Sequence, residues 1–288
     1  MRSLVCAAIW FVALMTMAKA DPLPAAYDVS VSYYLGSTQT LNSGNYVPAG
    51  PGTSAQLSGC VLSTPVRTAC GTSFAAVGDL GSTSSMHDTS QSTIPALYES
   101  SNGIEWFRDV VTVNGLSSGT YTVVPTVTVH GTSSWDFAAI PNTVGIGINE
   151  WAGDGTTMLD TVFADATEAV YSASFTLDPI AFQAGVPFNF MLGFGEAAFI
   201  YNTSVYGPGE NSLVQANFLD TMAVTGLEFL DSSGHPVNDF SVTSALGGIY
   251  STTGIIPTPE PGSGLLASTC AVLLAVGFWR RKRSQRGW

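Results

Sequence analysis

Positive charge is almost missing from the middle of this 288-residue chain. Between residues 21 and 258 the only basic side chains are Arg67 and Arg108, against twenty acidic ones, so the formal balance is 2 − 20 = −18. Such a segment repels phosphate backbones, which excludes nucleic acid as a partner. Convincing amphipathic helical patterns are also missing from it, which disfavours helical fold classes.

Imidazoles are scarce as well, since His87, His130 and His235 are the only three. No GxSxG elbow accompanies any of them, and no two histidines or cysteines have the spacing of zinc ligands. We therefore predict no catalytic residues, no enzyme activity and no cofactor apart from a candidate calcium ion. The twenty acids leave a secreted hydrolase with paired carboxylates as a remote alternative.

The body of the chain, between the two terminal segments, instead shows apolar and polar residues that alternate with a period of two. This alternation occurs in 27–33, 126–129, 171–177 and 188–194. Turn sequences such as Asn114-Gly115 and Gly153-Asp154-Gly155 separate these segments. The pattern predicts one antiparallel β-sandwich over residues 21–256, with the jelly roll as a candidate form. Segment 73–80 is the one candidate for a short helix.

Two cysteines, Cys60 and Cys70, lie in the body with nine residues between them. In an oxidising compartment the simplest interpretation is a disulfide, and two free thiols are the alternative. The other two cysteines lie in the terminal apolar segments.

Two further sets of side chains are candidate binding residues. Asn149, Glu150, Asp154 and Asp160 lie in a glycine-containing stretch that could bind calcium, although their order differs from that of an EF-hand and a solvated loop is the simpler interpretation. Trp106, Trp135 and Trp151 lie near strand ends or loops, where indole faces can stack on sugar rings. Packing of these tryptophans in the core is the alternative.

The N-terminus has the order of a secretory signal peptide. A basic residue, an uncharged apolar stretch and the small-x-small site Ala18-Lys19-Ala20 predict cleavage before Asp21, so residues 1–20 are assigned to the signal. A retained membrane helix is the alternative. In either case the body is expected outside the cytoplasm.

The C-terminus, residues 257–288, has three features in succession. Pro259-Glu260-Pro261 is followed by an uncharged run over 263–279 and then by the basic cluster Arg280, Arg281, Lys282 and Arg283. A helix over that run would be about 25 Å long, slightly less than a bilayer core of about 30 Å, and the basic cluster would remain cytoplasmic. A buried core helix is the alternative.

These three features resemble the PEP-CTERM sorting domain of exported bacterial proteins. The resemblance covers about residues 257–286 and implies that a membrane-embedded exosortase recognises Pro259, Glu260 and Pro261 and cleaves near them. It also implies an inner-membrane precursor and a mature body at the cell surface or in the extracellular matrix, in Gram-negative bacteria that make exopolysaccharide.

The sequence therefore predicts an exported, non-enzymatic surface or matrix protein that is sorted through its tail. The expected partners are an exosortase-type protease, the membrane through the C-terminal helix, and exopolysaccharide. A polysaccharide-binding module is the alternative function, and it depends on the three tryptophans.

Overall fold

The computed structural model describes residues 22–35, 38–48, 50–65, 67–88, 97–135, 144–165, 170–202 and 212–256. Within these ranges the secondary structure is entirely β, and all strand pairs are antiparallel. The predicted antiparallel β-sandwich is confirmed. The predicted signal peptide, membrane helix and sorting motif lie outside the described residues. In the part of the chain that is described, no helix has the length and apolar character needed to cross a membrane.

The first sheet, sheet A, has seven strands. Its order across the sheet is β2 (Thr38–Pro48), β1 (Ala26–Leu35), β6 (Leu97–Asn114), β12 (Phe188–Asn202), β8 (Val144–Trp151) and β9 (Met158–Asp165), with β14 (Ser241–Ser244) paired to β6.

The second sheet, sheet B, also has seven strands. Its order is β10 (Val170–Thr176), β7 (Thr120–Trp135), β13 (Ser212–Leu230), β5 (Asp79–Asp88), β4 (Arg67–Ala76) and β3 (Ala55–Ser63), with β11 (Ile180–Gln183) paired to β7. A separate hairpin joins β15 (Ile249–Ser251) to β16 (Gly254–Ile256).

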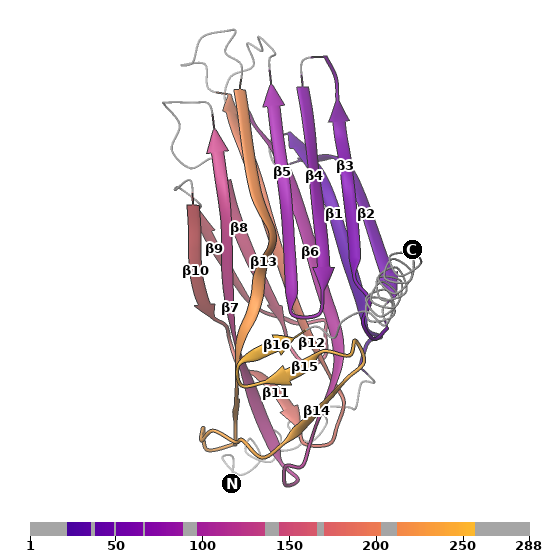
Figure 1. The fold of residues 1–288 in the computed structure, drawn as a ribbon, viewed down its shortest axis with the longest axis vertical. Coiled ribbons are helices and arrows are strands. Elements are labelled where there is room, and N and C mark those ends of the chain that lie inside the picture. Colours follow the sequence, from indigo (N-terminus) through magenta and orange to yellow (C-terminus); the bar gives the residue numbers. More distant parts are fainter. Residues whose placement is uncertain are drawn as a thin grey trace, which may run out of the picture.

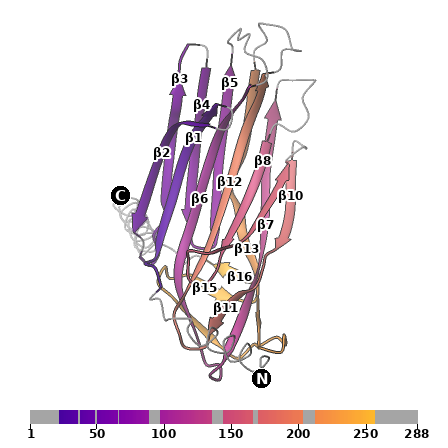
Figure 2. The ribbon, with the colours of Figure 1, turned by 180° about the vertical axis from the view of Figure 1, so that it is seen from behind.

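The two sheets lie face to face, with sheet B nearer the viewer in Figure 1 and sheet A nearer in Figure 2. From β5 onward the chain changes sheets repeatedly, because β5, β7, β10 and β13 belong to sheet B while β6, β8 and β12 belong to sheet A. The β15–β16 hairpin and β14 lie together near the lower end of the sandwich in Figure 1. Each sheet therefore has one inner face and one outer face that are built from sequence-distant strands.

The alternation predicted from the sequence places the core correctly. The inward side chains of β1 (Tyr27, Val29, Val31, Tyr33) and of β12 (Phe188, Phe190, Leu192, Phe194) are all buried. Those of β10 are half-buried, as expected at the edge of a sheet. Apart from Val31, the large side chains of β1 and β12 belong to one hydrophobic core between the sheets, and Tyr171 and Phe175 of β10 pack against it.

The short helix predicted for 73–80 is wrong. Residues up to Ala76 belong to β4 and residues from Asp79 belong to β5, with a tight turn between them. Gly78 has φ = 76°, a left-handed conformation that suits glycine in a hairpin turn and ends any helical path.

The predicted disulfide between Cys60 and Cys70 is confirmed. It joins β3 to β4 at directly paired positions, so it crosses a β-hairpin rather than closing an irregular loop. The turn of that hairpin is held by the Thr64 amide, which donates to the Arg67 carbonyl oxygen at 2.8 Å.

Replacing Cys60 and Cys70 together by serine should lower the free energy of unfolding by about 2–3 kcal/mol, because the cross-link restricts the unfolded chain. Urea unfolding of the oxidised wild-type protein and the double variant measures the difference. Ser58→Ala, on the same strand pair, is the matched control and should change stability by about 0.5 kcal/mol or less. Equal stability of the double variant and the wild-type protein would contradict this role.

Candidate carbohydrate-binding face

The outer surface of sheet A carries a strip of aromatic side chains. Tyr46, Trp106, Trp151 and Phe163, here called the aromatic face, come from β2, β6, β8 and β9. They share this surface because the inward positions of β6 and β8 alternate with half-buried outward ones, which include both tryptophans. Strand pairing places Tyr46 and Trp106 on either side of Asp28, in one row across the sheet.

Arg108 holds one end of this strip in place. Its Nε donates to the Pro24 carbonyl oxygen at 2.8 Å and its Nη2 to the Tyr46 hydroxyl at 3.3 Å. The guanidinium carbon lies 5.5 Å from the centre of the Trp106 ring, a cation–π distance. Trp106 and Tyr46 have ring centres 6.0 Å apart. The two rings are therefore fixed relative to one another before any ligand arrives.

Burial raises the pKa of the Asp28 carboxyl, and a hydrogen bond between Asp28 and the Trp106 side chain opposes that shift. Because this contact engages the polar edge of the indole, it restrains the orientation of the ring.

Glycines form the floor beside these rings. A Cβ atom placed on Gly193 would lie 3.1 Å from the outer ring atoms of Trp151 and 3.4 Å from the Cβ of Trp106. One placed on Gly147 would lie 3.5 Å from Phe163 Cε1, so Phe163 lies over that glycine. The third glycine, Gly195 of β12, is paired with Gly147 of β8. The absence of side chains at these three glycines lets the rings lie close to the sheet.

Much of this aromatic surface is open to solvent. Phe163 is 80% exposed and Tyr46 is 52% exposed, while Ile104 beside them is 38% exposed. Large apolar side chains exposed together on one face of a domain are typical of a binding site. Flat carbon faces, with polar edges supplied by Tyr46 and Arg108, match the alternation of C–H faces and hydroxyl edges on a sugar ring.

The structure brings together two of the three tryptophans predicted to stack on sugars. Trp106 and Trp151 lie on either side of Gly193. The backbone of Trp135 ends β7 in sheet B, and its side chain lies outside the described residues. Sequence reasoning missed Tyr46 and Phe163, because their meeting with the tryptophans depends on pairing between strands that are distant in the sequence.

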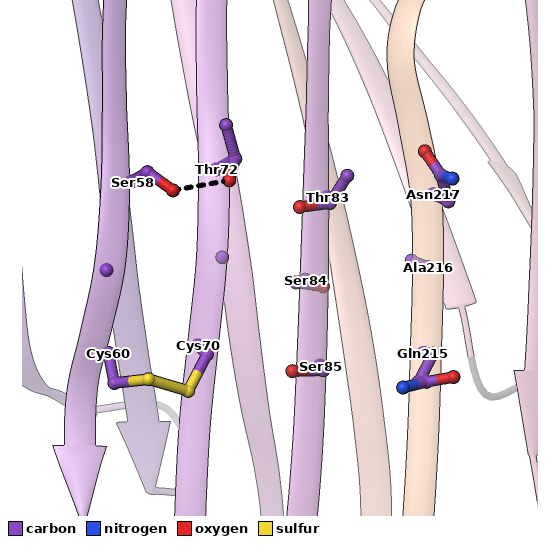
Figure 3. Close-up of a pocket in the computed structure, with 12 residues that line it drawn as sticks. Ser58, Cys60, Cys70, Thr72, Thr83, Ser84, Ser85, Gln215, Ala216 and Asn217 are labelled. Atoms are coloured by element: carbon purple, nitrogen blue, oxygen red, sulfur yellow. Dashed lines mark hydrogen bonds between the residues drawn. A yellow bond between two sulfur atoms is a disulfide. The ribbon is translucent and has the colours of Figure 1, made fainter.

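Sheet B has a shallow groove of different character on its outer face. About 460 Å³ in volume, it is lined by uncharged hydroxyl and amide side chains, with the Cys60–Cys70 disulfide at one end. In Figure 3, Ser58, Thr72, Thr83 and Asn217 lie in one row across four strands, and a hydrogen bond of 2.8 Å joins Ser58 to Thr72. The groove offers hydrogen bonds but no aromatic ring for stacking.

The four predicted calcium ligands do not form one site. Asn149 and Glu150 are consecutive in β8, so they face opposite sides of the sheet. Asp154 accepts hydrogen bonds from the amides of Thr156 and Thr157 at 2.8 and 2.9 Å, which fixes its own turn. Only Glu150 and Asp160 are directly paired. Across the described ranges, no group of three or more His, Cys, Asp or Glu side chains is arranged to hold a metal ion.

Glu150 is nevertheless an unusual acid. Its side chain is fully buried. Burial, followed by the nearby charges of Asp178 and Asp160, raises its pKa to about 8. The carboxyl therefore holds its proton at neutral pH and does not repel those neighbours.

The histidines lie apart from one another. His130 Nδ1 is 2.9 Å from the Ser172 hydroxyl on the outer face of sheet B, and His235 lies in a turn 3.6 Å from Asp231. His87 is paired with Thr68 and Leu213 in sheet B.

No family model matches the sequence, and no curated protein matches it. Solved structures that resemble the fold include TmCBM61 in complex with β-1,4-galactotriose, at 8% identity over 64% of this chain and 92% of that chain, with a TM-score of 0.19. Another, from work on the promiscuous specificity of carbohydrate-binding modules from the β-sandwich superfamily, is 10% identical over 70% of this chain and 94% of that chain, with a TM-score of 0.19. Similarity this low assigns no ligand, so the case for one depends on this chain's own residues.

Proposed function

We propose that this protein is an exported, non-enzymatic polysaccharide-binding module whose aromatic face binds a neutral glycan chain. The observation that carries the proposal is the row of rings on sheet A, fixed by Arg108 and lying over a glycine floor. The ligand is uncharged because the body around the site has a formal balance of 2 − 20 = −18 and repels polyanions.

The shape of the face favours an extended chain over a single sugar. Tyr46, Trp106, Trp151 and Phe163 come from strands that span sheet A from β2 to β9. Neighbouring strands lie about 4.8 Å apart, so these rings extend over several sugar lengths. A polymer that runs across the strands can contact several rings at once, whereas a monosaccharide contacts one.

The strand order supports a jelly roll as the form of the sandwich. Four strands of sheet B, in the order β10-β7-β13-β5, face four of sheet A, in the order β6-β12-β8-β9, and the chain passes repeatedly from one group to the other. The pairs β1–β2 and β3–β4 extend the two sheets at one side. Jelly rolls of this kind occur among lectin domains.

The aromatic face can be tested by replacing Trp106 and Trp151 by alanine, singly and together. Each single variant should weaken binding to a neutral polysaccharide by about 5-fold or more, because each loses about 1–3 kcal/mol of ring stacking, as for bases on aromatic side chains. Affinity electrophoresis in gels that contain neutral or anionic polysaccharides measures the retardation.

His130→Ala is the matched control, since His130 is exposed on the outer face of the opposite sheet. It should leave retardation unchanged. If the wild-type protein is retarded by no neutral polysaccharide, or if the Trp106 and Trp151 variants bind as well as it does, the proposed function is wrong.

Export and sorting remain a proposal from the sequence alone. We infer that residues 1–20 direct export, that residues 263–279 anchor a precursor in the inner membrane, and that an exosortase recognises Pro259-Glu260-Pro261. The mature body would then reach the cell surface or the matrix, where exopolysaccharide is available. Intact-mass analysis of the mature protein from sorting-competent cells tests this, and retention of residues 263–288 would contradict it.

A further inference from the structure

Two glutamates meet inside the sandwich, far from the aromatic face. Glu105 of β6 is 0% exposed and Glu196 of β12 is 2% exposed. Glu105 is paired with Phe194, and Glu196 with Gly103, so the two acids are diagonal neighbours on adjacent strands. Long side chains at diagonal positions on one face of a sheet reach one another.

Most of the oxygen atoms in this pair have no hydrogen-bond partner. Glu196 Oε2 accepts a hydrogen bond from the Ser84 hydroxyl at 2.8 Å. Among the described residues, no well-formed hydrogen bond reaches Glu196 Oε1 or either carboxylate oxygen of Glu105, although the Ser82 hydroxyl lies near both carboxyls and the Ser73 hydroxyl lies near that of Glu105. Buried polar atoms are nearly always paired, so three such oxygens in one place call for a ligand.

Ser82 of the opposite sheet is directed into the same place. Its side chain is 0% exposed, and its hydroxyl lies close to both carboxyls without a well-formed hydrogen bond to either. A Cβ atom placed on Gly103 would lie 2.8 Å from Ser82 Oγ and 3.1 Å from Glu196 Oε1, so both oxygens converge on Gly103. Because residue 103 is glycine, sheet B approaches sheet A closely at this point.

No basic side chain is available to neutralise the pair. Arg108 lies on the outer face and bonds Pro24 and Tyr46. Within the described ranges the inward residues of β4, β5 and β13 near the acids are small or apolar, and β1 brings only the phenols Tyr27 and Tyr33. Two carboxylates buried without a counter-charge would be very costly.

We propose that Glu105, Glu196 and Ser82 form an internal site for a hard divalent cation that links the two sheets. Four buried oxygen atoms that make no well-formed hydrogen bond, three of them from carboxylates, are of the kind that Ca²⁺ prefers, and its flexible geometry suits side chains from two sheets. Because the site is enclosed, the ion enters as the sheets come together, and its binding energy contributes to folding. The site does not depend on the proposed glycan binding.

Thermal unfolding of the purified full-length protein tests the site, with excess EDTA in one sample and excess Ca²⁺ in the other at a single pH. Ca²⁺ at about 100 times its Kd should raise the unfolding temperature by about 5–10 °C. NaCl at matched ionic strength is the control for charge screening, and the same rise with NaCl would overturn the proposal.

The variant Glu105→Gln combined with Glu196→Gln keeps the side-chain volumes and removes both charges, so its unfolding temperature should not respond to Ca²⁺. Asp109→Asn, a buried acid outside this site, is the matched control and should keep the full rise. If the double variant does not fold, equilibrium dialysis of the wild-type protein against Ca²⁺ measures binding directly. One Ca²⁺ per chain supports the site, and no bound Ca²⁺ overturns it.

Discussion

In the presence of a chelator, raising the pH from about 4.5 to about 8 should lower the free energy of unfolding of this protein. Burial raises the pKa of Glu196 from 4.5 to about 8. Burial together with the Glu196 charge raises that of Glu105 well above 4.5. The folded state therefore holds protons that the unfolded chain releases, and their contribution is fully present below pH 4.5 and lost as the pH rises through the folded pKa values.

The free energy of unfolding should fall steeply with rising pH. Each group contributes up to about 1.4 kcal/mol per pH unit within this window. Glu150, whose pKa is also raised to about 8, acts in the same direction. Asp154 and Asp231 have lowered pKa values, so their contributions are lost only at more acidic pH. The buried glutamates should therefore dominate between pH 5 and 8.

Urea unfolding at several pH values between 4.5 and 8 measures this slope. The Glu105→Gln, Glu196→Gln double variant is the comparison, and its stability should change less with pH because two of the acids with raised pKa values are gone, while Asp28, Asp109 and Glu150 remain. A wild-type stability that is constant or rises over this range would show that these acids are ionised, or solvated, in the folded state.

The strands of the core could be predicted from the sequence because their alternation is unambiguous. In 188–194 every second residue is large and apolar, and the structure buries those four. Segment 103–109 gives no such signal, because charged and large apolar residues occur in both sets of alternate positions. Pairing with β1 and β12 decides which face is buried, and a shift of one residue would reverse it. The inward orientation of Glu105 was therefore not predictable.

The candidate site was predictable only in part for the same reason. Trp106 and Trp151 are visible in the sequence as single residues, but nothing local places them beside Gly193. That arrangement needs β6, β12 and β8 to be neighbours although they are far apart along the chain. Residue types could be recognised in advance, whereas their assembly into one face depends on sheet order.

Replacing Asp109 by alanine should destabilise the protein by about 2–5 kcal/mol, because it leaves buried donors without an acceptor. The Asp109 carboxyl of β6 accepts hydrogen bonds from the Ser244 hydroxyl at 2.5 Å, the Leu246 amide at 3.0 Å and the Tyr250 hydroxyl at 2.8 Å. These three donors all lie in the last segment of the sandwich, 241–256. One side chain thus holds that segment against sheet A.

Urea unfolding and limited proteolysis check this role together. The Asp109→Ala variant should be cleaved within 241–256 faster than the wild-type protein, because that segment loses its attachment to β6. Thr243→Ala is the matched control: it removes an exposed hydroxyl that donates to the Thr112 carbonyl oxygen at 3.3 Å, and it should cost about 0.5 kcal/mol or less. If both variants unfold alike, the β14 pairing with β6 holds the segment, and the carboxyl does not.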